Sequence, residues 1–158
     1  MRWESLQIEQ FGIYQDEALG RFTEDPVRLV HFLHAKKSER ALDLGTGNGV
    51  IPIYANALYG CPFAGLDVDE AQLDLARLSA ERNGQDIPFY ALDVSAAPGA
   101  LGYGRFDLVT MNPPYYSEAT AGEAQKWTGM ICTPRRAIIQ VATGLSMPPE
   151  RKIGRAHV

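Results

Sequence analysis

The stretch ALDLGTGNGV restricts the fold of this chain more than any other feature. An apolar strand over residues 40–44 runs directly into Gly45, Gly47 and Gly49, and a helical pattern begins immediately afterwards. Glycine permits the backbone angles of a tight turn and lets a ligand approach the main chain closely. The stretch therefore predicts a strand, a tight turn and a helix, with a binding loop at the turn.

Short apolar segments alternate with helical patterns along most of the chain. We expect strands over residues 40–44, 63–66, 87–92 and 106–111. We expect helices starting at Asp25-Pro26, over 48–58, from Asp69 to Asn83-Gly84 and over about 133–143, with a hairpin over 6–15 around Gly12 before them. This alternation indicates an α/β fold, a parallel sheet with helices on both faces. Ligands of such sheets bind beyond the carboxyl ends of the strands.

The helix that starts at Asp69 carries a capping signal and an apolar stripe. Gln72, three residues after Asp69, predicts a reciprocal capping box. Ala71, Leu75 and Leu78 are spaced to form its buried face.

Composition limits the class of protein. The 158 residues predict one domain, and a net charge of −4 lacks the basic footprint usual for nucleic-acid binding, although a local basic patch is compatible with it. The two cysteines, Cys61 and Cys132, form no CxxC pair, so we expect neither a metal site nor a disulfide framework. The N-terminus has no signal-peptide core, and no apolar run approaches the roughly 20 residues that cross a bilayer. We therefore expect a cytoplasmic protein.

The glycine loop matches one of three nucleotide-binding patterns. The dinucleotide fingerprint GxGxxG would need glycine where Val50 stands, and the phosphate-binding GxxxxGK[ST] is absent. The stretch closely resembles the D/E-x-G-x-G-x-G loop of class I S-adenosylmethionine methyltransferases. That cofactor has a cationic centre, an amino-acid tail and an adenosine, but no pyrophosphate. A bare strand–helix turn is the alternative reading.

Two aspartates at expected strand ends are candidate contacts to the nucleoside. Asp67 stands about 22 residues after Gly45, where a carboxylate can accept hydrogen bonds from ribose hydroxyls. Asp93 could accept one from the adenine amino group. The alternative for Asp67 is helix capping, for which Asp69 is better placed, and the alternative for Asp93 is a simple turn.

The expected fourth strand ends in the sequence NPPYY. Two prolines cannot continue a central strand, because neither has an N–H for the ladder. The Asn112 side-chain oxygen and the Pro113 carbonyl could accept hydrogen bonds from a planar amine and aim its lone pair, with Pro114 fixing the backbone and Tyr115 stacking on the substrate. The segment therefore predicts N-methylation, and a turn with two half-buried tyrosines is the alternative.

Residues 4 to about 145 resemble the bacterial tRNA adenine-N6 methyltransferase family, whose studied member modifies adenine beside the anticodon of a valine tRNA. The resemblance rests on LDLGTGNGVIPI, GLDVDEAQLDLARLSAERNG and FDLVTMNPPYY, with GIYQDEALGRFTEDPVRLVHFL before them and ICTPRRAIIQVATGL after them. It implies that Asp43, Gly45 and Asp67 bind S-adenosylmethionine and that residues 112–115 hold the base. The implied partner is tRNA.

The chain departs from this family after the NPPY motif. SEATAGEAQKWTGMICT lacks the family's arginine and histidine, and candidate phosphate contacts are Lys36, Lys37, Lys126, Arg135 and Arg136, each of which is also an ordinary surface residue. We expect residues 1–39 to lead into the fold, 40–151 to form a methyltransferase domain lacking its last strands, and 152–158 to be a non-native tail. In such a chain the strand over 106–111 would be an exposed edge.

Other functions share the same motifs. A glutamine-N5 methyltransferase of the release-factor type also carries NPPY, although it usually has a helical N-terminal domain. A module that binds the cofactor without catalysis is a second alternative, and a DNA adenine methyltransferase is a weaker one.

Overall fold

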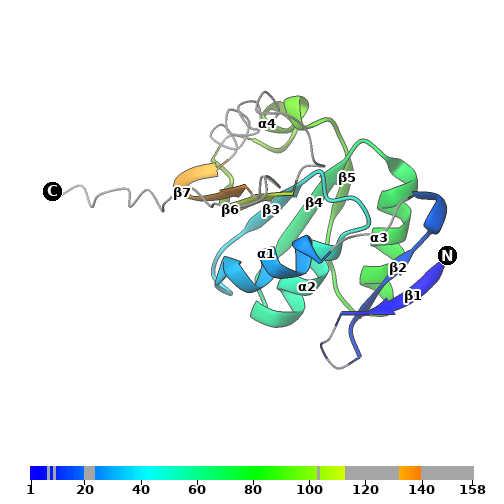
Figure 1. The fold of residues 1–158 in the computed structure, drawn as a ribbon. Coiled ribbons are helices and arrows are strands. Elements are labelled where there is room, and N and C mark those ends of the chain that lie inside the picture. The colour runs from blue at the N-terminus through cyan, green and yellow to red at the C-terminus, as the bar shows by residue number, and fades with distance from the viewer. Residues whose placement is uncertain (7, 9, 20–23, 103, 113–131, 140–158) are drawn as a thin grey trace, which may run out of the picture.

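A five-stranded parallel sheet forms the centre of the protein (Figure 1). The computed structural model describes residues 1–6, 8, 10–19, 24–102, 104–112 and 132–139. The strands are β3 (Ala41–Leu44), β4 (Phe63–Asp67), β5 (Phe89–Ala91), β6 (Phe106–Met111) and β7 (Cys132–Ile139). Their order in the sheet is β5-β4-β3-β6-β7. The α/β class predicted from the sequence is confirmed.

Helices cover both faces of this sheet (Figure 1). They are α1 (Asp25–Leu33), α2 (Val50–Tyr59), α3 (Glu70–Arg82) and the short α4 (Ala97–Leu101), with 3-10 turns η1 (Glu17–Leu19) and η2 (Val94–Ala96). Alternate strand residues point to opposite faces. Ala41 and Leu108 therefore join the core beneath α1, α2 and α3, whereas Leu42 and Val109 join the core beneath α4.

The N-terminal hairpin differs from the predicted one. β1 (Arg2–Ser5) pairs antiparallel with β2 (Gly12–Gln15), so the connection lies where we expected the first strand. Gly12 begins β2 and does not make the turn. A Cβ there would come within 2.5 Å of the Trp3 ring, so the glycine is explained by close packing across the hairpin.

The segment expected to be the last helix is a strand. Thr133-Pro134 predicts a helix start, but β7 pairs parallel with β6 through Ala137, Ile138 and Ile139. The register is irregular around the proline, which has no N–H to donate: β7 advances from 132 to 136 while β6 advances from 106 to 108. Because β7 pairs with β6, the prediction that β6 is an exposed edge is wrong.

The structure contains one of the two contacts predicted for the capping box of α3. The Asp69 side chain accepts hydrogen bonds from the backbone N–H groups of Ala71 and Gln72. The Gln72 side chain does not return to Asp69; its Nε2 donates to the Leu19 carbonyl at 2.7 Å. The buried face also differs from the predicted one. Ala71 and Leu78 are exposed, and the buried apolar residues of α3 are Leu73, Leu75, Ala76 and Ala80.

Two further sequence predictions concern membrane-spanning segments and the boundaries of the domain. None of the helices in the described ranges is long and apolar enough to cross a membrane. The boundaries at residues 39 and 151 stay predictions, and the expected tail, 152–158, lies outside the described residues.

Candidate functional site

The parallel register brings the predicted site residues to one edge of the sheet. Leu44 is level with Leu66 of β4 and with Met111 of β6. The next residues along these three strands are Gly45, Asp67 and Asn112, which therefore lie beside one another where the strands end. On the other side of β4, Asp67 pairs with Ala91 of β5, and Asp93 follows two residues later.

Glycine is required at the three positions of the loop for two different structural reasons. All have positive φ angles, of 66° at Gly45, 55° at Gly47 and 79° at Gly49, which side-chain-bearing residues rarely adopt. A Cβ on either of the first two would meet no atom of the described residues within 4 Å. A Cβ on Gly49 would lie 2.9 Å from Ala76 and 3.0 Å from the Phe89 ring. Gly45 and Gly47 thus leave space for a ligand, whereas Gly49 lets α2 pack closely.

Asp43 is a buried acid of the central strand β3, level with Thr110 of the neighbouring strand β6. Thr110 Oγ1 donates a hydrogen bond to its Oδ1 at 2.6 Å. Burial raises the pKa of the Asp43 carboxyl from 3.8 to about 7; the hydroxyls of Thr110 and Thr46 oppose this rise, and the negative charge of Asp67 adds to it. The Thr46 hydroxyl is close enough to favour the ionised form, yet neither its Oγ1 nor Asp43 Oδ2 reaches hydrogen-bonding geometry with a described group.

Asp67 ties the glycine loop to the end of β4. Its Oδ2 accepts the backbone N–H of Gly47 at 2.8 Å, and its Oδ1 accepts that of Asp69 at 3.0 Å. Asp69 is therefore the helix cap, as predicted, while Asp67 has its own structural bonds. An ionised carboxylate has about four acceptor positions, so room for ribose hydroxyls remains.

Asp93 has the turn role that was the alternative reading. Its Oδ1 accepts hydrogen bonds from the backbone N–H of Ser95, at 2.8 Å, and from the Ser95 hydroxyl. These bonds lower the pKa of the exposed Asp93 carboxyl. A contact between Asp93 and an adenine ring stays a prediction.

Asn112 is half-buried and follows the last residue of β6. It lies next to Gly45, at the edge where the sequence predicts that a methyl acceptor and the cofactor meet, and its role there stays a prediction. Pro113, Pro114 and Tyr115 lie outside the described residues, so their predicted roles stay predictions.

Sequence reasoning missed Thr110, which the structure places against Asp43. Thr110 stands two residues before Asn112 on the same side of β6, in the otherwise apolar run LVTM. A hydroxyl in a central strand needs a buried hydrogen-bond partner. That requirement, together with an aspartate in the neighbouring strand, is the signal that could have identified the pair.

The residues at this edge fit S-adenosylmethionine. Asp43 Oδ2 is a buried acceptor that has no hydrogen-bond partner within the described part of the chain, which suits the ammonium of an amino-acid tail. Gly45 and Gly47, which follow Asp43 along the chain, leave open space at the same edge, and the Asp67 carboxylate lies at the end of the neighbouring strand β4. A metal ion has no comparable place within the described ranges, where no group of three or more His, Cys, Asp or Glu could hold one.

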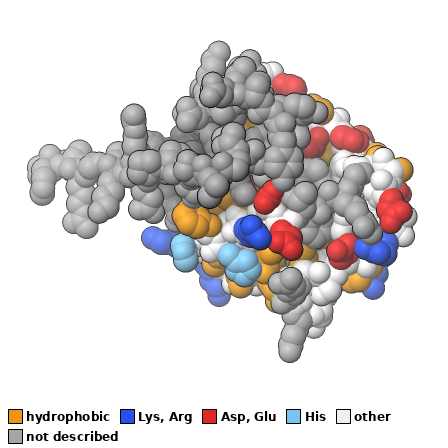
Figure 2. All heavy atoms as spheres, in the orientation of Figure 1, with side chains coloured by type: hydrophobic (Ala, Val, Ile, Leu, Met, Phe, Trp, Pro, Cys, Tyr) orange, Lys and Arg blue, Asp and Glu red, His pale blue; other side chains and the backbone are white. Residues whose placement is uncertain are grey.

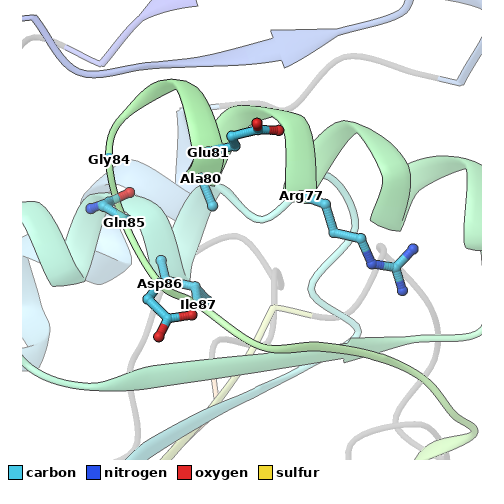
Figure 3. A pocket seen from close by; sticks show the side chains of 7 residues that line it. All are labelled: Arg77, Ala80, Glu81, Gly84, Gln85, Asp86 and Ile87. Atoms are coloured by element: carbon cyan, nitrogen blue, oxygen red, sulfur yellow. The ribbon is translucent and has the colours of Figure 1, made fainter.

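A hollow of about 400 Å³ lies elsewhere on the molecule (Figure 3). It is lined by the C-terminal half of α3 and by the segment that leads to β5, including Arg77, Glu81, Gln85 and Asp86. This segment enters β5 at its amino end, whereas the glycine loop follows the carboxyl end of β3. The hollow is therefore separate from the candidate site.

Basic side chains gather near the end of α1 on one face (Figure 2). The described histidines are His31, in α1, and His34, which caps it; His31 Nε2 and the Tyr54 hydroxyl are hydrogen-bonded at 2.8 Å. Lys36 and Lys37 follow and are exposed. These two lysines are accessible to phosphate groups. They follow α1 and precede β3, however, and so lie at the edge of the sheet opposite the glycine loop.

Comparison with known proteins identifies relatives of this chain. A family model described as "Methyltransferase small domain" matches residues 22–140. A release factor glutamine methyltransferase from Bordetella pertussis is 34% identical over 120 residues, 74% of this chain and 42% of that protein. A ribosomal RNA large subunit methyltransferase F from Psychromonas ingrahamii is 33% identical over 100 residues, 57% of this chain and 32% of that protein. The chain thus spans less than half the length of these relatives.

The fold also matches a solved structure. An RNA methyltransferase from Salinibacter ruber, solved with S-adenosyl-L-homocysteine, has a TM-score of 0.61 and 19% identity, covering 72% of this chain and 71% of the other. At this identity the match concerns the fold alone, and it agrees with the parallel sheet and flanking helices described above.

Proposed function

The chain belongs to the methyltransferase small domain family, whose members use S-adenosylmethionine, and we propose that it methylates the exocyclic N6 of an adenine in a tRNA. The observation that carries this proposal is the position of Asn112 beside Gly45, at the edge where β3 and β6 end. A methyl acceptor held by Asn112 would lie next to the cofactor's loop. The cytoplasm is the compartment we propose for this reaction.

The residues of the site have distinct tasks in this proposal. The bound cofactor supplies an electrophilic methyl group. Asp43 holds the amino-acid tail and Asp67 the ribose, while Gly45 and Gly47 leave the main chain open to both. The Asn112 side-chain oxygen accepts an N–H of the adenine amine, which orients the nitrogen lone pair and stabilises the positive charge that develops there.

The choice of RNA as substrate has two supports. The flanking sequences around the shared motifs resemble the tRNA adenine-N6 family, and one relative is named a ribosomal RNA methyltransferase. The exposed Lys36 and Lys37 lie at the opposite edge of the sheet, so they are candidate phosphate contacts only for an RNA that extends from the site to that edge. Both supports concern the class of substrate, and the identity of the tRNA is left to experiment.

A second candidate function is methylation of a glutamine side chain in a release factor. The specific observation in its favour is the relative of that name, which is 34% identical over 74% of this chain. A glutamine amide and an adenine amine are both planar, so the same asparagine could hold either. A chain that binds the cofactor without transferring its methyl group is the third candidate.

The test presents the full chain with radiolabelled S-adenosylmethionine and, in parallel, unmodified tRNA, ribosomal RNA and a release factor. We expect label in tRNA, recovered as N6-methyladenosine after digestion. Label in the release factor would replace the proposed substrate by a protein, and label in none of the three would favour the binding module.

Asn112→Ala tests the residue that carries the proposal. We expect methyl transfer to fall by about a hundredfold or more, the loss typical of one positioned group in a transition state, with unchanged binding of S-adenosylhomocysteine. Asn56→Ala is the matched control, because Asn56 lies in the last turns of α2, where its Nδ2 donates to the Cys61 carbonyl. Equal activity of the two variants would remove Asn112 from the mechanism.

A further inference from the structure

Thr110 and Asp43 form a buried pair across the two central strands. They are register partners on β6 and β3, and their side chains are joined by the 2.6 Å hydrogen bond described above. Thr110 is 0% exposed and Asp43 is 1% exposed. Because water cannot reach either group, the hydroxyl has no competing partner in solvent, and the bond keeps the carboxylate in one orientation.

This orientation leaves the second oxygen of Asp43 available to a ligand. Among the described residues, Asp43 Oδ2 has neither a hydrogen-bond partner nor a cation that forms an ion pair with it. A buried carboxylate oxygen without a partner is strongly unfavourable. Two residues further along the chain, Gly45 leaves open space at the same edge. A cationic group of a ligand bound in that space would lie two residues along the chain from this carboxyl group, at the same end of β3.

The groups around Asp43 differ in which protonation state they favour. Burial raises its pKa to about 7, and the Asp67 carboxylate at the end of β4 acts in the same direction. The helix α2, which packs over this face, has no charged side chain, and Thr110 is the residue of β6 that contacts Asp43. Thr110 and Thr46 lower the pKa. Thr110 therefore both orients the carboxyl group and favours its ionised form.

We infer that Thr110 is a positioning residue for the cofactor, because it holds Asp43 with Oδ2 turned toward the ammonium of the amino-acid tail. The inference rests on the proposed function in that it takes S-adenosylmethionine as the cofactor. It adds a requirement for a hydroxyl at position 110. A hydrogen bond to a charged group corresponds to about ten- to a hundredfold in affinity, which is the loss expected when that hydroxyl is removed.

Two ligands separate this role from general damage to the fold. S-adenosylhomocysteine carries the amino-acid tail, whereas 5′-methylthioadenosine has the same nucleoside without it. Calorimetric titration of the full chain should show that Thr110→Val weakens the first ligand by about ten- to a hundredfold and leaves the second within about twofold. Thr110→Ser, which restores the hydroxyl, should bind both ligands like the parent protein.

The pH profile gives a second readout. In the parent protein the affinity for S-adenosylhomocysteine should rise as the pH increases through about 7, because Asp43 then ionises, while the affinity for 5′-methylthioadenosine should not follow it. In Thr110→Val the midpoint should move to higher pH, since one group that favours the carboxylate has gone.

Equal weakening of both ligands in Thr110→Val, or unchanged binding of both, would overturn the inference. So would a parent protein that binds neither ligand, and that result would also remove the cofactor assignment. These measurements need no methyl acceptor. A failure to methylate tRNA would therefore defeat the proposed substrate, while the ratio of the two affinities still decides the role of Thr110.

Discussion

Asp43→Asn should gain stability relative to the cofactor-free parent protein as the pH rises, although it removes an acid from the candidate site. The carboxyl is protonated in both the folded and the unfolded chain below its ordinary pKa of 3.8. As the pH rises further, the unfolded chain releases the proton first, because burial raises the pKa of the folded group to about 7. Stability is therefore lost between these two values and stays constant above the second.

The size of this loss follows from the two pKa values. Taking about 1.4 kcal/mol for each tenfold change in proton affinity, a rise from 3.8 to about 7 corresponds to about 4 kcal/mol. About 2.5 kcal/mol of this falls between pH 5 and pH 8, where urea titrations of both proteins are practical. Asparagine at position 43 does not titrate, and the other acids are common to both proteins. The unfolding free energy of the variant minus that of the parent should therefore increase as the pH rises.

The measurement is urea unfolding of the parent protein and of Asp43→Asn at several pH values from 5 to 8. A difference that stays constant with pH would refute the reasoning, as would a variant whose deficit grows toward pH 8. Saturating S-adenosylhomocysteine supplies the complementary test. At a hundred times its dissociation constant it should stabilise the parent by about 2.7 kcal/mol and the variant by much less, because the variant lacks the anionic partner of the ligand's ammonium.

Three further substitutions test other parts of the structure. Gly49→Ala should lower the stability measured by thermal unfolding by about 2–4 kcal/mol, because its Cβ would overlap Ala76 and its backbone is left-handed. Gly47→Ala should lower stability by only about 1 kcal/mol but should weaken cofactor binding. Equal losses of stability in the two variants would contradict the different reasons given for these glycines. Asn83→Ala removes two hydrogen bonds to Gly12 of the N-terminal hairpin and one to the Ser79 carbonyl within α3, and should cost about 2–3 kcal/mol, with faster amide exchange in the hairpin as the decisive sign. Asp69→Ala removes the cap of α3 and should lower stability by about 1 kcal/mol, and an unchanged melting temperature would argue against the cap.

The parts of the fold that were predictable follow from local rules. The turn after residue 44 was visible because glycine at positive φ leaves a direct mark in the sequence, and the alternation of strands and helices then implied a parallel sheet. Parallel strands present their carboxyl ends at one edge, so the shared location of Asp67 and Asn112 could be expected without knowing the strand order.

The parts that were not predictable depend on contacts between distant residues. Thr133-Pro134 has the local chemistry of a helix start, and only pairing with β6 makes it part of a strand. Gln72 has the spacing of a capping box, but its side chain binds the Leu19 carbonyl, which lies 53 residues earlier. The pair of Thr110 with Asp43 spans 67 residues, and a periodicity in one strand does not reveal its partner in another.

The attachment of the N-terminal hairpin to α3 has a consequence for the order of folding. Asn83 bonds to the N–H and carbonyl of Gly12, and Ser79 Oγ accepts the N–H of Tyr14, across 71 and 65 residues. A two-stranded hairpin is marginally stable by itself. During synthesis the hairpin must therefore wait for the chain to extend beyond α3 before it docks. The hairpin is made before α3 but reaches its final packing only after it, as expected for contacts of long sequence separation.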